Sequence, residues 1–120
     1  MLRSSDALAH DAAYLDAIFA AIRAFAHDFE ASKRWLARAE QTQGAAWRLS
    51  FLREARAAFE RATERLAVVG SRLAALGPID RLPPPLDRIH GNVVTMCADL
   101  AAQGSRLEAA EGEVEPIGRA

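Results

Sequence analysis

The chain has one cysteine and no long apolar run, and these absences exclude several kinds of protein. Because Cys97 is the only cysteine among 120 residues, neither an intrachain disulfide nor a zinc site built from cysteines can form. The longest uninterrupted apolar stretch, residues 17–22, is far shorter than the roughly 20 residues that cross a bilayer. Residues 1–10 lack the apolar run of a signal peptide, so we expect a cytoplasmic protein without membrane contact.

The chain also has almost no net charge. Fifteen basic residues stand against sixteen acidic ones, which gives a formal net charge of −1. No overall field therefore attracts nucleic acid or a membrane surface. Lys33 is the only lysine, and this preference for arginine, together with abundant alanine, indicates a GC-rich, bacterial genome. The composition, 51% hydrophobic and 26% charged, is that of a globular domain.

Apolar residues recur every seven positions in three separate segments. The rows are Leu8, Leu15, Ile22, Phe29 and Leu36, then Ala45, Leu52, Phe59, Leu66 and Leu73, then Leu86, Val93, Leu100, Leu107 and Val114. A second row accompanies each of these, and the three second rows comprise Ile18, Phe25 and Ala39, then Ala55, Ala62, Val69 and Leu76, then Ile89, Met96 and Ala110. This spacing places apolar side chains on one face of a helix and does not fit the two-residue period of a strand.

The three rows predict an all-α protein. We expect a single domain over residues 1–120, with helices at about 5–41, 45–76 and 84–111 and a frayed tail at 112–120. The fold is predicted to be an elongated, up-down-up antiparallel three-helix bundle with coiled-coil-like heptad packing. At 1.5 Å per residue, helices of this size give a bundle roughly 40–55 Å long.

Glycine and proline mark the two corners. The first row and the second are out of phase, so the chain must reverse near residues 41–44, where Gly44 is expected to end the first helix in a left-handed conformation. Gly77 and Pro78 mark the second corner. The proline triplet at 83–85 can then supply the first turn of the third helix, where a missing N–H group has no cost. We interpret residues 79–89 as a stiff corner.

The residues that could carry out chemistry do not form a recognisable site. His10, His27 and His90 lie off the apolar rows and have no metal-ligand spacing, so we predict no metal and no cofactor. A histidine phosphotransfer protein remains an alternative, although no histidine is followed by the basic residue and glycine that such domains usually carry. Cys97 lies beside the third row and is expected to be a small buried residue. We therefore predict that the protein is not an enzyme.

Basic and aromatic residues are interleaved around the first corner, in the segment 33–56. The candidate patch for an anionic partner comprises Lys33, Arg34, Trp35, Arg38, Trp47 and Arg48. Such a mixture can bind single-stranded nucleic acid by stacking and phosphate contacts, which is a second alternative. Against it, an up-down-up bundle brings the acidic end of the third helix to this corner, where it would neutralise the patch. The acidic residues are Glu108, Glu111, Glu113 and Glu115.

Small residues follow the outward faces of the first and third helices. The two stripes are Ala13, Ala17, Ala20, Ala24 and Ala31, and Val94, Ala98 and Ala101 with Ser105. An outward face normally alternates charges, whereas small residues let another helix approach closely. We predict a non-enzymatic interaction module, an adaptor, chaperone-like protein or regulatory subunit, that forms a homodimer or binds a partner helix. Alanine is also the best helix former, so composition alone could produce the stripes.

Overall fold

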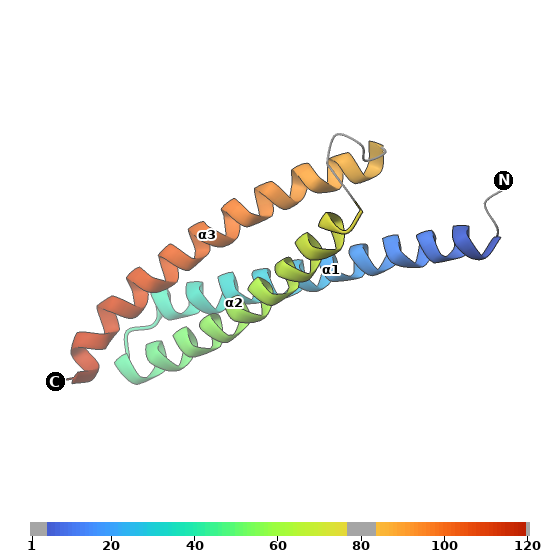
Figure 1. The fold of residues 1–120 in the computed structure, drawn as a ribbon. Helices are drawn as coiled ribbons and strands as arrows, with labels where there is room; N and C mark the ends of the chain where they lie inside the picture. The colour runs from blue at the N-terminus through green and yellow to red at the C-terminus, as the bar shows by residue number, and fades with distance from the viewer. Residues whose placement is uncertain (1–4, 77–83, 120) are drawn as a thin grey trace.

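The protein is described here by a computed structural model, which covers residues 5–76 and 84–119. It contains three helices, α1 (Ser5–Gln41), α2 (Ala45–Ala74) and α3 (Pro84–Arg119), and no strand within these ranges. The chain runs along α1, returns along α2 and reverses again into α3 (Figure 1). The predicted all-α three-helix bundle is confirmed.

The molecule is a rod with principal extents of 71 × 24 × 20 Å. It is longer than the expected 40–55 Å because the helices are offset along the axis. The N-terminal part of α1 extends past the end of α2 and the start of α3, and α1 and α3 diverge toward that end (Figure 1).

The closest packing in the bundle is between α1 and α2. Three alanines of α2, Ala55, Ala58 and Ala62, are completely buried. Small side chains at a contact shorten the distance between helix axes, so this part of α2 lets α1 approach closely. The contact of α3 is mainly with α2, and α1 and α3 pack sparsely against each other.

The apolar interior consists of two clusters, one at each end of the rod. The cluster toward the second corner contains Ile18, Phe25, Ala62, Leu66, Val69, Leu73, Ile89, Val93 and Leu100. The cluster toward the first corner contains Leu36, Ala39, Leu52, Ala55, Leu107, Ala110 and Val114. The ring of Phe59 packs against both clusters.

A buried polar layer lies between the two clusters and joins all three helices. Ser32 of α1 is completely buried, and its Oγ donates a hydrogen bond to the carbonyl oxygen of Ala55 in α2 at 2.9 Å. Gln103 of α3 is 2% exposed, and its Nε2 donates to Ser32 Oγ at 3.2 Å. Asp28, one turn before Ser32, is also buried and lies 3.3 Å from Arg61 Nε and 3.6 Å from Arg65 Nε of α2.

Thr42 makes the hydrogen bonds that end α1, and Gly44 does not adopt the left-handed conformation that was expected of it. Thr42 Oγ1 donates to the carbonyl of Arg38 at 2.6 Å, and the Thr42 backbone N–H donates to Ala39 at 3.2 Å. These bonds satisfy carbonyls that the helix end leaves without partners. Gly44 instead precedes α2 with extended backbone angles, φ −73° and ψ 124°. The expectation for Gly44 was therefore wrong, although the chain does reverse at residues 42–44.

The second corner falls largely outside the described residues. α2 ends at Ala74, and a turn at 75–76 follows it. Gly77, Pro78 and the rest of the segment to residue 83 are not described, so the first part of the predicted stiff corner, 79–83, lies outside the described residues, and its second part, 84–89, belongs to α3. α3 begins at Pro84, within the triplet that was predicted to start it.

The frayed tail expected at 112–120 is wrong over its described part, because α3 continues to Arg119. Val114 explains the extension, since it is buried in the cluster at the first corner. Arg48 Nη2 of α2 also lies 3.5 Å from Glu113 Oε2. Residues 112–114 are therefore fixed by packing and by an ion pair. Residue 120 is not described.

The buried polar layer predicts a pair of stability measurements. Ser32→Ala leaves the buried Gln103 amide without its acceptor, so the free energy of unfolding should fall by about 1–3 kcal/mol. Adding Gln103→Met removes the orphaned amide and should recover part of that loss. Urea denaturation followed by helical circular dichroism measures both. A double variant that is less stable than Ser32→Ala would contradict this account.

Gly104 of α3 gives a second stability prediction. A Cβ atom there would lie 3.0 Å from Cζ of Phe59, closer than side chains normally pack. Gly91, on the same helix, has open space around it. Gly91→Ala should raise the free energy of unfolding by about 0.5–1 kcal/mol through helix propensity. Gly104→Ala should gain less or lose stability, because Phe59 must move. Equal gains in urea denaturation would show that Phe59 yields freely.

Candidate interaction surfaces

The outward face of α3 carries exposed small and apolar side chains. Val94 is 58% exposed, and Ala98 and Ala101 are also exposed. Ser105, which continues the stripe, turns its hydroxyl back to the carbonyl of Ala101 at 3.3 Å. Asp99 is the only charge between Ile89 and Ser105, and it lies about 100° around the helix from Ala98. The face is therefore both exposed and free of charge.

The alanine stripe of α1 is partly covered by α2. Ala13 and Ala20 are exposed, whereas the other three members, Ala17, Ala24 and Ala31, are half-buried. The stripe lies on the side of α1 that carries Asp28, whose carboxylate contacts Arg61 and Arg65 of α2. Part of this stripe thus serves packing within the chain, and only part is accessible to another molecule.

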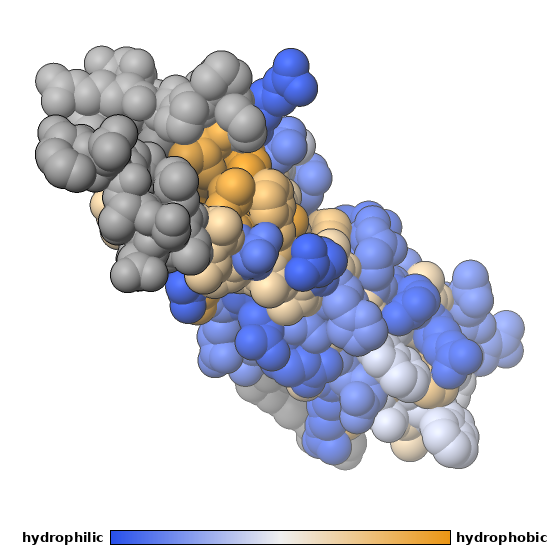
Figure 2. All heavy atoms as spheres, turned by 90° about the vertical axis from the view of Figure 1, so that its right-hand side faces the viewer, coloured by the Kyte–Doolittle hydropathy of each residue, from blue (hydrophilic) through white to orange (hydrophobic). Residues whose placement is uncertain are grey.

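The opposite side of α1 is more open than the heptad pattern predicts. Leu15, Ile22 and Phe29 are half-buried, whereas Ile18 and Phe25 of the second row are buried. Phe19 is 36% exposed. The row expected to form the main seam is therefore only half covered, because α1 and α3 pack sparsely. In the view of Figure 2, which looks along the rod from the side of the α1 N-terminus, apolar side chains gather in one patch and hydrophilic ones cover much of the rest.

An aromatic stack joins α1 and α2 at the first corner. The Trp35 and Phe51 rings lie 5.7 Å apart, and the Trp47 and Phe51 rings 6.1 Å apart, measured between centroids. The Arg38 guanidinium lies 5.3 Å from the Trp35 ring. Trp35 is half-buried, as expected for a residue that covers the bundle end, but Trp47 is 66% exposed. Phe51 was not predicted, although its spacing of four from Trp47 places both on one helix face.

Three of the six cations in the segment 33–56 are paired with described carboxylates. Arg56 donates to both carboxylate oxygens of Glu111, at 3.1 and 2.5 Å, and these bonds raise the pKa of Arg56 above its already high usual value. Arg48 pairs with Glu113, and Lys33 with Glu30 at 2.8 Å. The predicted neutralisation by the acidic end of α3 thus holds for Glu111 and Glu113.

The remaining members of the patch are differently placed. Arg34 and Arg38 are exposed and form no ion pair with another described residue. Glu108 is exposed as well, and the side chain of Glu115 is not described. Of the candidate patch, Arg34, Arg38 and Trp47 thus remain exposed to another molecule.

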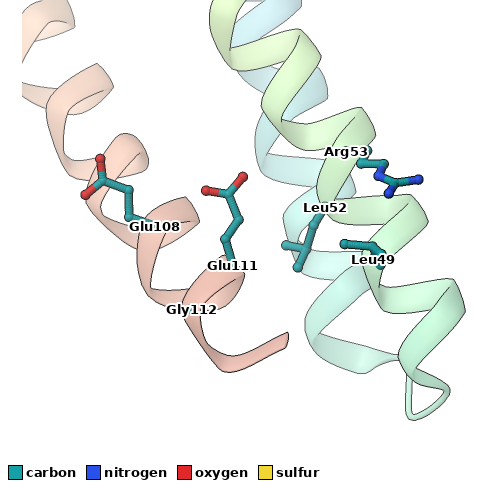
Figure 3. Close-up of a pocket in the computed structure, with 6 residues that line it drawn as sticks. All are labelled: Leu49, Leu52, Arg53, Glu108, Glu111 and Gly112. Carbon is teal, nitrogen blue, oxygen red and sulfur yellow. The ribbon is translucent and has the colours of Figure 1, made fainter. Parts of the chain in front are cut away.

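A shallow cleft of about 410 Å³ lies between α2 and α3 near this corner (Figure 3). Its lining residues are Leu49, Leu52, Arg53, Glu108, Glu111 and Gly112. The two leucines come from α2 and the glutamates from α3. Because Glu111 is already bound to Arg56, the cleft can offer an apolar contact with Glu108 and Arg53 beside it.

No protein-family model, curated protein or solved structure matches this chain. The geometry of the described residues must therefore carry the functional argument.

The candidate residues for chemistry remain scattered in the fold. Cys97 is exposed, so the expectation of a buried residue was wrong: it lies beside the row formed by Val93 and Leu100, at an edge that the neighbouring helices leave uncovered. His27 is exposed and His90 half-buried, while the side chain of His10 is not described. Within the described ranges, no three side chains of the types that bind metals come together. Nor does any helix, as far as it is described, have both the length and the apolar character needed to cross a membrane.

The Arg56–Glu111 pair predicts a salt-dependent contribution to stability. Arg56→Met keeps an apolar side chain over Phe59 but removes the pair that joins α2 to α3. Because both side chains are partly exposed, the free energy of unfolding should fall by only about 0.5–1 kcal/mol at low salt, and by less at high salt. Arg53→Met on the same helix is the control and should change little. Equal urea midpoints for the two variants would contradict this role.

Proposed function

We propose that this protein is a non-enzymatic interaction module that works through helix–helix contacts on the exposed faces of α1 and α3. The outward face of α3 provides the main support. Val94 is more than half exposed there, and no charge surrounds it on the stripe with Ala98 and Ala101. A face of this kind is what an adaptor, a chaperone-like protein or a regulatory subunit presents to a second helix.

The size of the side chains also supports a helical partner. The side chains of Ala98 and Ala101 are small, so the axis of a partner helix can lie close to the axis of α3. The same arrangement already operates inside the molecule, where Ala55, Ala58 and Ala62 of α2 pack close to α1. Val94 adds an apolar side chain that another molecule can cover.

The corner patch supports a binding function less strongly. Arg48 and Lys33 each pair with a carboxylate, and Arg38 stacks on Trp35. A phosphate or an acidic peptide would have to compete with these contacts. Association through helix faces meets no such competition, since Val94, Ala98 and Ala101 have no polar partners to lose.

The proposal predicts that a charge on the α3 face weakens association. Ala98→Glu would force a carboxylate into a helix contact without a partner, which costs several kcal/mol. Self-association, measured by sedimentation velocity, or binding to a co-purified partner should therefore weaken by at least about tenfold. Val94→Glu should act in the same way.

The matched control is Ala57→Glu, which places the same charge on an exposed alanine of α2. Its neighbours on that face include Arg53, Glu54 and Glu60, so association should not change. Circular dichroism confirms that each variant remains helical. An Ala98→Glu protein that binds itself and its partners as tightly as the unaltered chain would refute the proposed role of this face.

A further inference from the structure

The chain exposes more surface than a compact protein of its size. Its accessible area is 8005 Å², whereas monomeric proteins of 13.0 kDa expose roughly 6,300 Å². The excess, roughly 1,700 Å², is larger than the ~800 Å² that each partner contributes to an ordinary stable interface. The elongated shape therefore leaves enough area for an interface with a second copy.

One edge of α1 combines exposure with an apolar centre. Five exposed residues recur at spacings of four and three and so share one face: Ala12, Asp16, Phe19, Arg23 and Ala26. This edge lies on the side of α1 nearly opposite Asp28, and hence away from α2. The half-buried Leu15 and Ile22 lie beside it, so Phe19 continues an apolar surface that reaches the cluster toward the second corner.

The edge is complementary to its own copy when the copy runs in the opposite direction. A two-fold axis beside Phe19 places Asp16 of one copy opposite Arg23 of the other, because residue 19 is close to the midpoint between them. The same axis places Ala12 opposite the other copy's Ala26, and small residues on both sides let the helices approach closely. Neither Asp16 nor Arg23 forms an ion pair with another described residue, and both side chains are exposed.

We infer that this edge binds a second copy of the chain, through an antiparallel α1–α1 contact that is centred on Phe19 and flanked by two Asp16–Arg23 ion pairs. The inference rests on the proposed function and specifies its self-associating partner. A two-fold contact uses the same patch on both copies and closes the assembly as a dimer. The charge-free face of α3 lies on another helix and stays available for a different partner.

The charge pairs allow a test by reversal. Asp16→Arg and Arg23→Asp each replace two attractive contacts across the axis with two repulsive ones, because the symmetry doubles every change. Each single variant should weaken the dimer by at least about tenfold in sedimentation velocity. The double variant restores both pairs in reversed order and should dimerise nearly as tightly as the unaltered chain. Asp16 and Arg23 are seven residues apart, about 10.5 Å along the helix, so they cannot restore each other within one copy.

The control is Arg53→Asp with Glu60→Arg, an exposed pair of the same spacing on α2, which should leave the dimer unchanged. Phe19→Asp should abolish dimerisation while the helical circular dichroism is kept. The inference is overturned if the double reversal is no tighter than the single ones, or if the unaltered chain stays monomeric up to about 100 µM. If Ala98→Glu weakens binding and the α1 reversals do not, the proposed function stands and the α1 dimer is wrong.

Discussion

Among the described residues, the hydroxyl of Ser32 is the one point at which hydrogen bonds join all three helices. It donates to the Ala55 carbonyl of α2 and accepts from the Gln103 amide of α3, and both side chains are buried. A shift of α3 by one turn, about 5.4 Å, would leave a buried amide unpaired, which costs more than a displaced apolar contact. The apolar clusters on either side can tolerate small slips, whereas the polar layer cannot. The alignment of α3 with the other two helices therefore depends on this layer.

Alanine determines how the helices divide their contacts. The α2 side chains that let α1 lie close are small, namely Ala55, Ala58 and Ala62. On α1, the half-buried alanines at 17, 24 and 31 let α2 cover one side of the helix. Because α1 is held close to α2, α3 approaches mainly from the α2 side. Gly104 contributes to this contact by making room for the Phe59 ring. The consequence is an asymmetric bundle in which one side of α1 is packed and the other stays half open.

The sequence could predict the elements better than their arrangement. Heptad rows located three helices because apolar periodicity is a local property, and α1 was predicted with the bounds that the structure has. The same rows also contained the polar layer, since Ser32 and Gln103 occupy the gaps in the second rows, between Phe25 and Ala39 and between Met96 and Ala110. Those gaps were not recognised as a paired signal, because two polar residues 71 positions apart meet only once the helices are aligned.

The candidate surfaces were predictable only in part, for a related reason. Exposure of Val94 and Ala98 follows from the face of one helix, and periodicity located it. The half-open side of α1 depends on how far α3 lies from Phe19 and Ile22, which no single helix encodes. Pairing of Arg48 with Glu113 followed from the up-down-up topology, but the full length of α3 did not. The helix continues beyond residue 111 because Val114 packs into the cluster toward the first corner, which also contains residues of α1 and α2.

The distribution of charge connects this asymmetry to function. Ion pairs gather where α3 meets α2 and where α2 meets α1, so Arg56, Arg61 and Arg65 are engaged within the chain. Asp16 and Arg23 on the open side of α1 have no such partners among the described residues, and the stripe of Val94, Ala98 and Ala101 on α3 carries no charge. Ion pairs thus neutralise the charges where the helices of the rod meet. Two exposed surfaces remain, the self-complementary edge of α1 and the charge-free stripe of α3. We propose that the edge of α1 binds a second copy and that the face of α3 binds a partner of different sequence, which would let the same small bundle assemble and bind at once.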